Sequence, residues 1–401
     1  MQGSRQMNWQ DPDVQQRIAE WQQLLDWRGR DSRLVRGAFA WSRWKKKFLN
    51  TLKWRLRRKK TPAETDSLRV LFWLPGGLGD AACAKRLVTA YRFFLPQARF
   101  DIYAPLPGVA KMLFGADKNT RILEKDDFSP FDYDLALQAC MAVKFLQVTP
   151  ERIECLAPRF GEVVRRAEEA QKSLGSLLDD VFLTEGVLGR WLYEQGARRF
   201  ELLSYTGGVE LPHDAQEQLQ TDAEPRRKWG LEGVKYITFH DGTSEAQVMA
   251  HVRPTRAWPA VRWCEFFRLF KKEFPQIKLV QLGGRNSPVY EEADVCLVGK
   301  TAVAELPSLL AGALAHLDTE SGLVHLAQFL PVRSVVLFGP SSAHFLGYAK
   351  NENLDCGPCG GCMWITPDWM KRCPLGHEPA PCVERITAQA VLAALRRILP
   401  H

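Results

Sequence analysis

The sequence predicts an α/β protein built from two Rossmann-like domains. Short, nearly continuous apolar segments alternate with segments of helical periodicity, and glycine or small polar residues follow several of the apolar segments. Such segments are typical of strands buried on both faces of a parallel sheet. The alternation occurs twice, separated by a polar stretch at 205–230, and 401 residues suffice for two domains and an extension. We therefore expect a doubly wound architecture in which the two domains face each other across a cleft.

The first 65 residues are expected to form a basic helical extension. Asp11 and Pro12 are typical of a helix start, and a second helix is predicted from Ser32 to about Arg58. Residues 31–60 hold twelve Lys or Arg and one acid, so this segment carries a net charge of +11 in a chain of net charge +8. Tryptophans interleaved with these cations suit an interfacial helix on anionic lipid. A helix packed on the catalytic body or used in oligomerisation fits equally well.

The first α/β domain is expected at residues 66–215. A strand at 68–74 leads into the turn PGGLGD, which contains Gly77, Gly79 and Asp80, and a helix follows from about Ala81 to Phe94. Further strands are predicted at 100–104, 121–123 and 133–137, and residues 150–200 are predicted to be mostly helical. A carboxylate beside a helix start either caps the helix or, at a cleft, acts as a general base toward an acceptor hydroxyl. Both roles stay open for Asp80.

The second α/β domain is expected at residues 216–401. Its predicted strands are 236–240, 278–282, 295–298, 313–317 and 334–338, and a helix is predicted from about Trp263 to Phe274. Ligands of open α/β sheets bind beyond the carboxyl ends of the strands. Thr243, Ser244 and Arg256 follow the first of these strands, and small hydroxyls with a cation suit a diphosphate.

A second candidate group follows the strand predicted at 313–317. Ser321 and Gly322 at a helix start suit an anion, while Asp318 or Glu320 suits ribose hydroxyls. His325 lies four residues after Ser321 on the same helix, so both can face one ligand or serve only the structure.

Five of the ten cysteines fall between positions 356 and 382. Their spacing, C-x2-C-x2-C followed by two further cysteines, provides more thiolates than one tetrahedral metal site needs. We expect one structural metal ion, iron or zinc, that folds the loop 354–384 and takes no part in catalysis. Free thiols or redox disulfides are the alternative.

The composition limits the location and the partners. No apolar stretch approaches the roughly 20 residues that span a bilayer, and the N-terminus lacks a signal peptide pattern. We expect a cytoplasmic protein, with peripheral contact to the inner membrane through 31–60 left open. A nucleic-acid-binding scaffold would use the basic segment but would leave both α/β runs unexplained, so no nucleic acid is expected.

In this order, the motifs resemble those of glycosyltransferase family 9, the ADP-heptose-dependent heptosyltransferases of the GT-B fold. The resemblance covers about residues 68–400 and rests on GGLGD, R-A-W-P, E-S-G-L-V-H-L-A and L-F-G-P-S. It implies that Asp80 is the general base and that Arg256, where the family usually has lysine, holds the donor diphosphate. It also implies that Glu320, Ser321, Gly322 and His325 bind nucleotide, with glutamate standing where the family has aspartate.

The cysteine region resembles a smaller branch of heptosyltransferases, which modify autotransporter proteins. By that pattern the metal ligands are Cys359, Cys362, Cys373 and Cys382, and Cys356 is extra. The implied function is inverting transfer of a sugar from a nucleotide-sugar, ADP-heptose first, to a lipopolysaccharide or other glycan acceptor. A protein acceptor, or a non-catalytic nucleotide-sugar-binding protein, is the alternative, and a homo-oligomer is left open.

Overall fold

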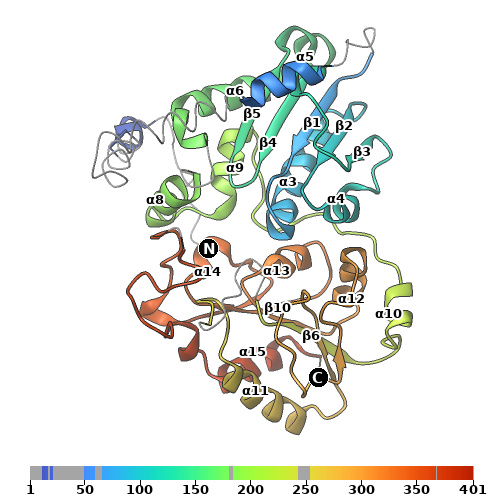
Figure 1. Cartoon of the computed structure of the whole chain (residues 1–401), viewed down its shortest axis with the longest axis vertical. Helices are drawn as coiled ribbons and strands as arrows, with labels where there is room; N and C mark the ends of the chain where they lie inside the picture. The colour runs from blue at the N-terminus through green and yellow to red at the C-terminus, as the bar shows by residue number, and fades with distance from the viewer. Residues whose placement is uncertain are drawn as a thin grey trace. The chain divides into compact units, whose positions relative to one another are not determined.

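The computed structural model describes residues 11–16, 19–20, 49–58, 66–179, 184–242, 253–366 and 368–400. The chain divides into two compact units (Figure 1). Unit 1 comprises Met1–Leu192 with Arg199–Leu211, and unit 2 comprises Tyr193–Arg198 with Pro212–His401. Most of the predicted extension lies outside the described residues, but 49–57 are helical as expected.

Unit 1 contains a five-stranded sheet in the order β3-β2-β1-β4-β5. The strands are β1 (Arg69–Trp73), β2 (Arg99–Tyr103), β3 (Thr120–Leu123), β4 (Leu135–Ala139) and β5 (Val143–Val148). All pairs are parallel except β4 with β5, which is antiparallel. The apolar run of β1 forms a central strand because Val70, Leu71 and Phe72 are all buried.

Helices of several lengths accompany this sheet. They are α3 (Leu78–Phe94), α4 (Pro107–Phe114), α5 (Pro150–Leu156), α6 (Pro158–Leu174), α8 (Arg190–Glu194) and α9 (Arg199–Gly207), with the short turns η1 (Pro130–Asp132), η2 (Gly175–Leu178) and the π-helix η3 (Thr184–Gly189). α3 begins at Leu78, so Gly79 and Asp80 lie in its first turn, three residues earlier than predicted.

Unit 2 contains a six-stranded sheet in the order β11-β10-β9-β6-β7-β8, with every pair parallel. The strands are β6 (Tyr236–His240), β7 (Lys278–Gln281), β8 (Val295–Cys296), β9 (His316–Thr319), β10 (Ser334–Phe338) and β11 (Glu352–Asp355). The helices are α10 (Glu224–Lys228), α11 (Ala260–Glu273), α12 (Leu306–Ala311), α13 (Gly322–Ala327), α14 (Ala343–Leu346) and α15 (Ala388–Ile398), with the turns η5 (Val303–Glu305), η6 (Gly357–Cys359) and η7 (Val383–Arg385).

One large core holds the unit 2 sheet against α11 and α15, which lie side by side in Figure 1. Aromatic side chains of α11, including Trp263, Phe266 and Phe267, pack with Phe239 of β6. The α/β class with two mainly parallel sheets is therefore confirmed.

Three predictions about the strands were wrong. β9 begins at His316 and ends at Thr319, so Asp318 lies inside the strand and not in the loop after it. The edge strands β5 and β11 were missed, because half-exposed side chains give β5 a mixed pattern and ENLD in β11 is mostly polar. Edge strands need no continuous apolar run, since one side of them faces solvent.

Candidate functional site

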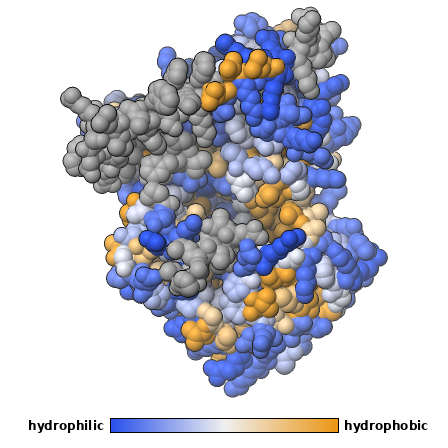
Figure 2. Space-filling view, in the orientation of Figure 1, coloured by the Kyte–Doolittle hydropathy of each residue, from blue (hydrophilic) through white to orange (hydrophobic). Residues whose placement is uncertain are grey.

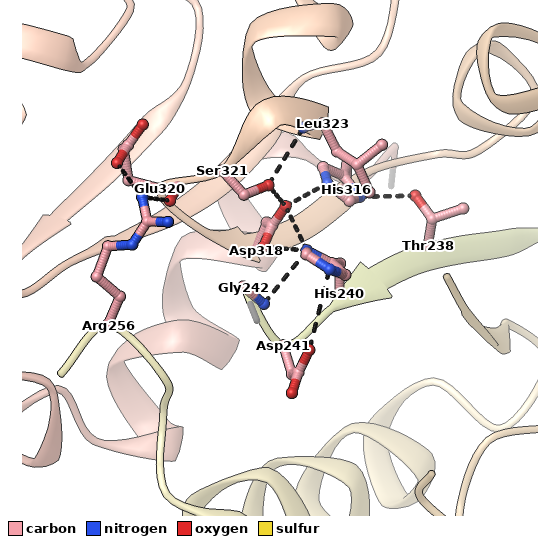
Figure 3. A network of polar contacts seen from close by, with 10 residues as sticks. All are labelled: Thr238, His240, Asp241, Gly242, Arg256, His316, Asp318, Glu320, Ser321 and Leu323. Carbon is pink, nitrogen blue, oxygen red and sulfur yellow. Dashed lines mark hydrogen bonds and ion pairs between the residues drawn. The ribbon is translucent and has the colours of Figure 1, made fainter. Parts of the chain in front are cut away.

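The loops that follow β6, β9 and β10 meet at one edge of the unit 2 sheet, because β9 pairs in parallel with both of the other strands. Parallel strands end at the same edge, where ligands of such folds bind. Figure 3 shows the side chains at the ends of β6 and β9 pointing toward one another.

Asp318 is the centre of a fully buried polar network at this edge (Figure 3). Its Oδ1 lies 3.0 Å from His240 Nδ1, and its Oδ2 lies 3.2 Å from His316 Nε2. The Ser321 hydroxyl donates to the same carboxylate. Burial alone would raise the pKa of Asp318, but the charge and hydrogen bonds of His240 and His316 lower it. Since both oxygens have internal partners, we propose that Asp318 orders the loops and does not contact ribose.

Arg256 is held by Glu320. Its Nη1 donates to the Glu320 backbone oxygen at 2.9 Å and to Oε2 at 2.8 Å. His325 Nε2 lies 3.1 Å from Glu320 Oε1, and His325 Nδ1 lies 2.6 Å from the Tyr348 hydroxyl. Burial would raise the pKa of Glu320, but the hydrogen bond of His325 and the charge of Arg256 lower it to about 2. A charged Glu320 therefore fixes the plane of the Arg256 guanidinium.

Three buried polar groups at the same strand ends have no hydrogen-bond partner within the described part of the chain: Arg256 Nε, Thr319 Oγ1 and Ser341 Oγ. Buried polar groups are nearly always paired, so such a set indicates a missing ligand or water. The backbone at Gly242 approaches the same place, because a Cβ there would overlap the Thr319 side chain. Gly242 also has a φ of +76°, which favours glycine.

The remaining predicted residues of unit 2 have mixed outcomes. Ser321 is the N-cap of α13, where its hydroxyl accepts from Leu323 N at 3.2 Å. Gly322 is the first residue of that six-residue helix. Thr243 and Ser244 lie outside the described residues. The ligand roles of all these residues stay predictions.

In unit 1, Asp80 serves the helix and still meets solvent. Its Oδ2 accepts from Gly77 N at 3.2 Å, which is the capping role, and its side chain is 39% exposed. Its Oδ1 lies 3.6 Å from Nη2 of Arg199, a buried residue of α9. Arg199 also donates to the backbone oxygens of Cys140 and Met141. Sequence reasoning missed Arg199, because nothing in the helical stretch around it marks a partner 119 positions away.

The cysteine-rich loop is bonded to the loops after β6 and β10. Cys356 Sγ donates to Gly339 O at 3.5 Å, and Cys382 Sγ donates to Thr255 O at 3.8 Å. Thr255 Oγ1 in turn donates to Trp369 O at 2.7 Å. The segment that carries Arg256 is therefore anchored on this loop.

None of the ten cysteines, all of which are described, forms a disulfide bond. Burial, and then the neighbouring thiol of Cys382, raises the pKa of Cys356 to about 12 and that of Cys362 to about 11. Outside the undescribed positions, no three His, Cys, Asp or Glu are arranged as ligands of one ion. The thiols of the cysteine-rich loop thus lie near one another, but among the described residues they are not arranged as the ligands of one ion.

Comparison with known proteins agrees with these features. Residues 193–363 match the family model described as glycosyltransferase family 9 (heptosyltransferase). Lipopolysaccharide heptosyltransferase 1 of Pseudomonas aeruginosa PAO1 is 28% identical in an alignment of 200 residues that covers 46% of this chain. The chain spans about half the length of that curated relative, 51%.

Two solved structures have a similar fold. The iron-containing dodecameric glycosyltransferase TibC from enterotoxigenic Escherichia coli H10407 matches with a TM-score of 0.53 and 13% identity, over 84% of this chain and 80% of TibC. A dodecameric iron-containing TibC described as a complex with ADP-D-β-D-heptose matches with a TM-score of 0.54 and 15% identity, over 85% and 80%. Residues 193–363 are therefore similar to glycosyltransferase family 9, the heptosyltransferase family, and the chain has the GT-B fold of the related structures.

Proposed function

We propose that this chain is a cytoplasmic glycosyltransferase that takes a sugar from a nucleotide-sugar, with ADP-heptose as the donor. The observation that carries the proposal is the Arg256 guanidinium, which Glu320 fixes while its Nε stays buried and unpaired among the described residues. A donor diphosphate supplies the missing acceptors for Arg256 Nε and for the hydroxyls of Thr319 and Ser341. The matched family domain and the named relative support heptose as the sugar.

Asp80 is proposed as the general base for a glycan acceptor. Its partly exposed carboxylate takes the proton of an acceptor hydroxyl, and that oxygen attacks the anomeric carbon. The bond to the diphosphate breaks on the opposite face, so the configuration inverts. Arg256 stabilises the negative charge that develops on the departing diphosphate. Lipopolysaccharide is the proposed acceptor, following the named relative.

The donor site is tested by binding. ADP, GDP, UDP and ADP-heptose are titrated calorimetrically into the wild type, Arg256→Gln and the control Arg397→Gln, which removes an exposed arginine of α15. Losing one charge-assisted contact should weaken ADP binding about tenfold to a hundredfold in Arg256→Gln and leave the control unchanged. Equal ADP affinity in all three proteins would remove Arg256 from the site.

We also propose one structural metal ion, iron or zinc, held by Cys359, Cys362, Cys373 and Cys382. The four side chains are of the right chemical kind, because soft thiolates bind these metals. A bound cation would also offset the burial and the neighbouring thiols that raise the pKa of Cys362. Such an ion would fix the loop that anchors Thr255, and it has no part in the transfer step. Elemental analysis should find about one metal per chain, lost in Cys373→Ser and kept in the control Cys296→Ser. Metal-free wild type would contradict this proposal.

A further inference from the structure

Helix 49–57 is attached to unit 1 by one face. Trp54 packs edge-on against Trp73 at the end of β1, with ring centroids 6.3 Å apart. On the same side, Lys53 Nζ lies 2.8 Å from Asp126 Oδ2, and Arg57 Nη1 lies 3.1 Å from Asp126 Oδ1. Trp54, Lys53 and Arg57 therefore make intramolecular contacts on this face of the helix.

The opposite face of this helix is apolar and exposed. Leu49, Leu52 and Leu56 are 49%, 43% and 79% exposed. Their spacing of three and four residues places them in one row about 10 Å long. Figure 2 shows the resulting apolar patch, bordered by hydrophilic residues, over the blue helix of Figure 1. Surface helices normally turn their leucines inward, so this row indicates a partner.

The charge of the segment indicates which partner. Arg55 on this helix and Arg58 just after its end are exposed, 49–58 contains no acidic residue, and residues 31–60 carry a net charge of +11. A second copy of this face would bring two strongly positive segments together, which is unfavourable. A nucleic acid would leave the leucines without an apolar partner. The aromatic side chain of this helix, Trp54, is already packed on Trp73 and so is not presented to a base. An anionic bilayer satisfies both features, because headgroups neutralise the arginines while the leucines enter the acyl boundary.

We propose that helix 49–57 is a lipid-docking surface, with Leu49, Leu52 and Leu56 inserted in an anionic leaflet and Arg55 and Arg58 at its headgroups. The helix would lie in the plane of the interface. It is anchored through Trp54 and Asp126, so unit 1 would be held at the membrane. None of the helices in the described part of the chain has the length and hydropathy to span a bilayer.

The test is co-sedimentation of the full chain with vesicles of phosphatidylcholine alone or with about one third phosphatidylglycerol. The wild type should bind the anionic vesicles at least tenfold more strongly than the neutral ones. Leu52→Ser/Leu56→Ser should lose at least tenfold on anionic vesicles, and Arg55→Gln/Arg58→Gln should lose severalfold. The control is Val261→Ser/Val289→Ser, which removes two side chains that are 72% and 63% exposed in unit 2, and it should bind like the wild type.

Circular dichroism checks that each variant is folded, which is expected because the altered side chains lie on the exposed face. Wild-type binding that the leucine variant retains would overturn the proposal, as would absence of binding to anionic vesicles. A lipid-free oligomer that the leucine variant dissociates would assign the face to a second copy instead. Donor binding does not enter this test, so its outcome is independent of the proposed activity.

Discussion

The contribution of Glu320 to stability depends on pH in a way that the structure defines. Its side chain is 8% exposed, its carboxylate lies between Arg256 and His325, and its pKa is lowered from 4.5 to about 2. That depression corresponds to about 3 kcal/mol of folding free energy at neutral pH. Because the folded-state pKa is the lower one, this stability is complete above about pH 4.5 and is lost as the pH falls toward 2.

We predict that Glu320→Gln lowers the free energy of unfolding by about 3 kcal/mol at pH 7. Glutamine keeps the shape of the side chain but removes the charge that pairs with the partly buried Arg256. The difference from the wild type should shrink between pH 4.5 and pH 3, where the wild-type carboxylate begins to take up its proton. Urea unfolding followed by tryptophan fluorescence at pH 7, 5.5, 4 and 3 measures this directly.

The matched control is Glu273→Gln. Glu273 also pairs with an arginine, Arg396, but both side chains meet solvent, so the variant should differ little from the wild type at any pH. A Glu320→Gln deficit as large at pH 3 as at pH 7 would mean that packing, not charge, is responsible. No deficit at pH 7 would show that the buried ion pair contributes no net stability.

Three further substitutions test separate contacts. Thr255→Val leaves the Trp369 carbonyl without its donor, so it should lower the free energy of unfolding by about 1–3 kcal/mol and weaken ADP binding severalfold. Unchanged ADP affinity would show that the cysteine-rich loop does not influence the donor site. Gly242→Ala introduces a Cβ at positive φ against Thr319, so it should lower the free energy of unfolding by about 2–4 kcal/mol, measured by thermal unfolding. Wild-type stability would show that this backbone is not constrained. Arg199→Met removes a buried cation that pairs with the partly exposed Asp80 and donates to two backbone carbonyls, and it should destabilise unit 1 by about 1–3 kcal/mol, with partial recovery in Arg199→Lys. An equal loss in both variants would assign the effect to packing alone.

The sequence was sufficient to predict the bounds of the elements that are buried on one side or completely. β6 and β10 have the predicted bounds because YITFH and SVVLF are buried along their whole length. The expectation that polar groups after β6, β9 and β10 gather at one edge followed from parallel pairing alone, and it holds for Arg256 and Glu320.

What could not be predicted is the choice of partners by buried charges. His240 and Asp318 are 78 positions apart, and Arg199 and Asp80 are 119 positions apart, so only the folded chain determines these pairs. The sequence gives no sign that Asp318 is fully buried, since its neighbours Glu320 and Ser321 are also polar. The sequence likewise gives no sign that Glu320, which directly follows β9, is buried and pairs with Arg256 in the loop after β6.

The most direct test of the account is transfer by Asp80→Asn. ADP-heptose is mixed with excess enzyme and lipopolysaccharide from a heptose-deficient strain, and product formation in one turnover is followed beside calorimetric ADP binding. Loss of a general base should slow transfer at least about a hundredfold, while the ADP dissociation constant stays that of the wild type because Asp80 and Arg256 lie in different units. Wild-type transfer by Asp80→Asn would contradict the central claim.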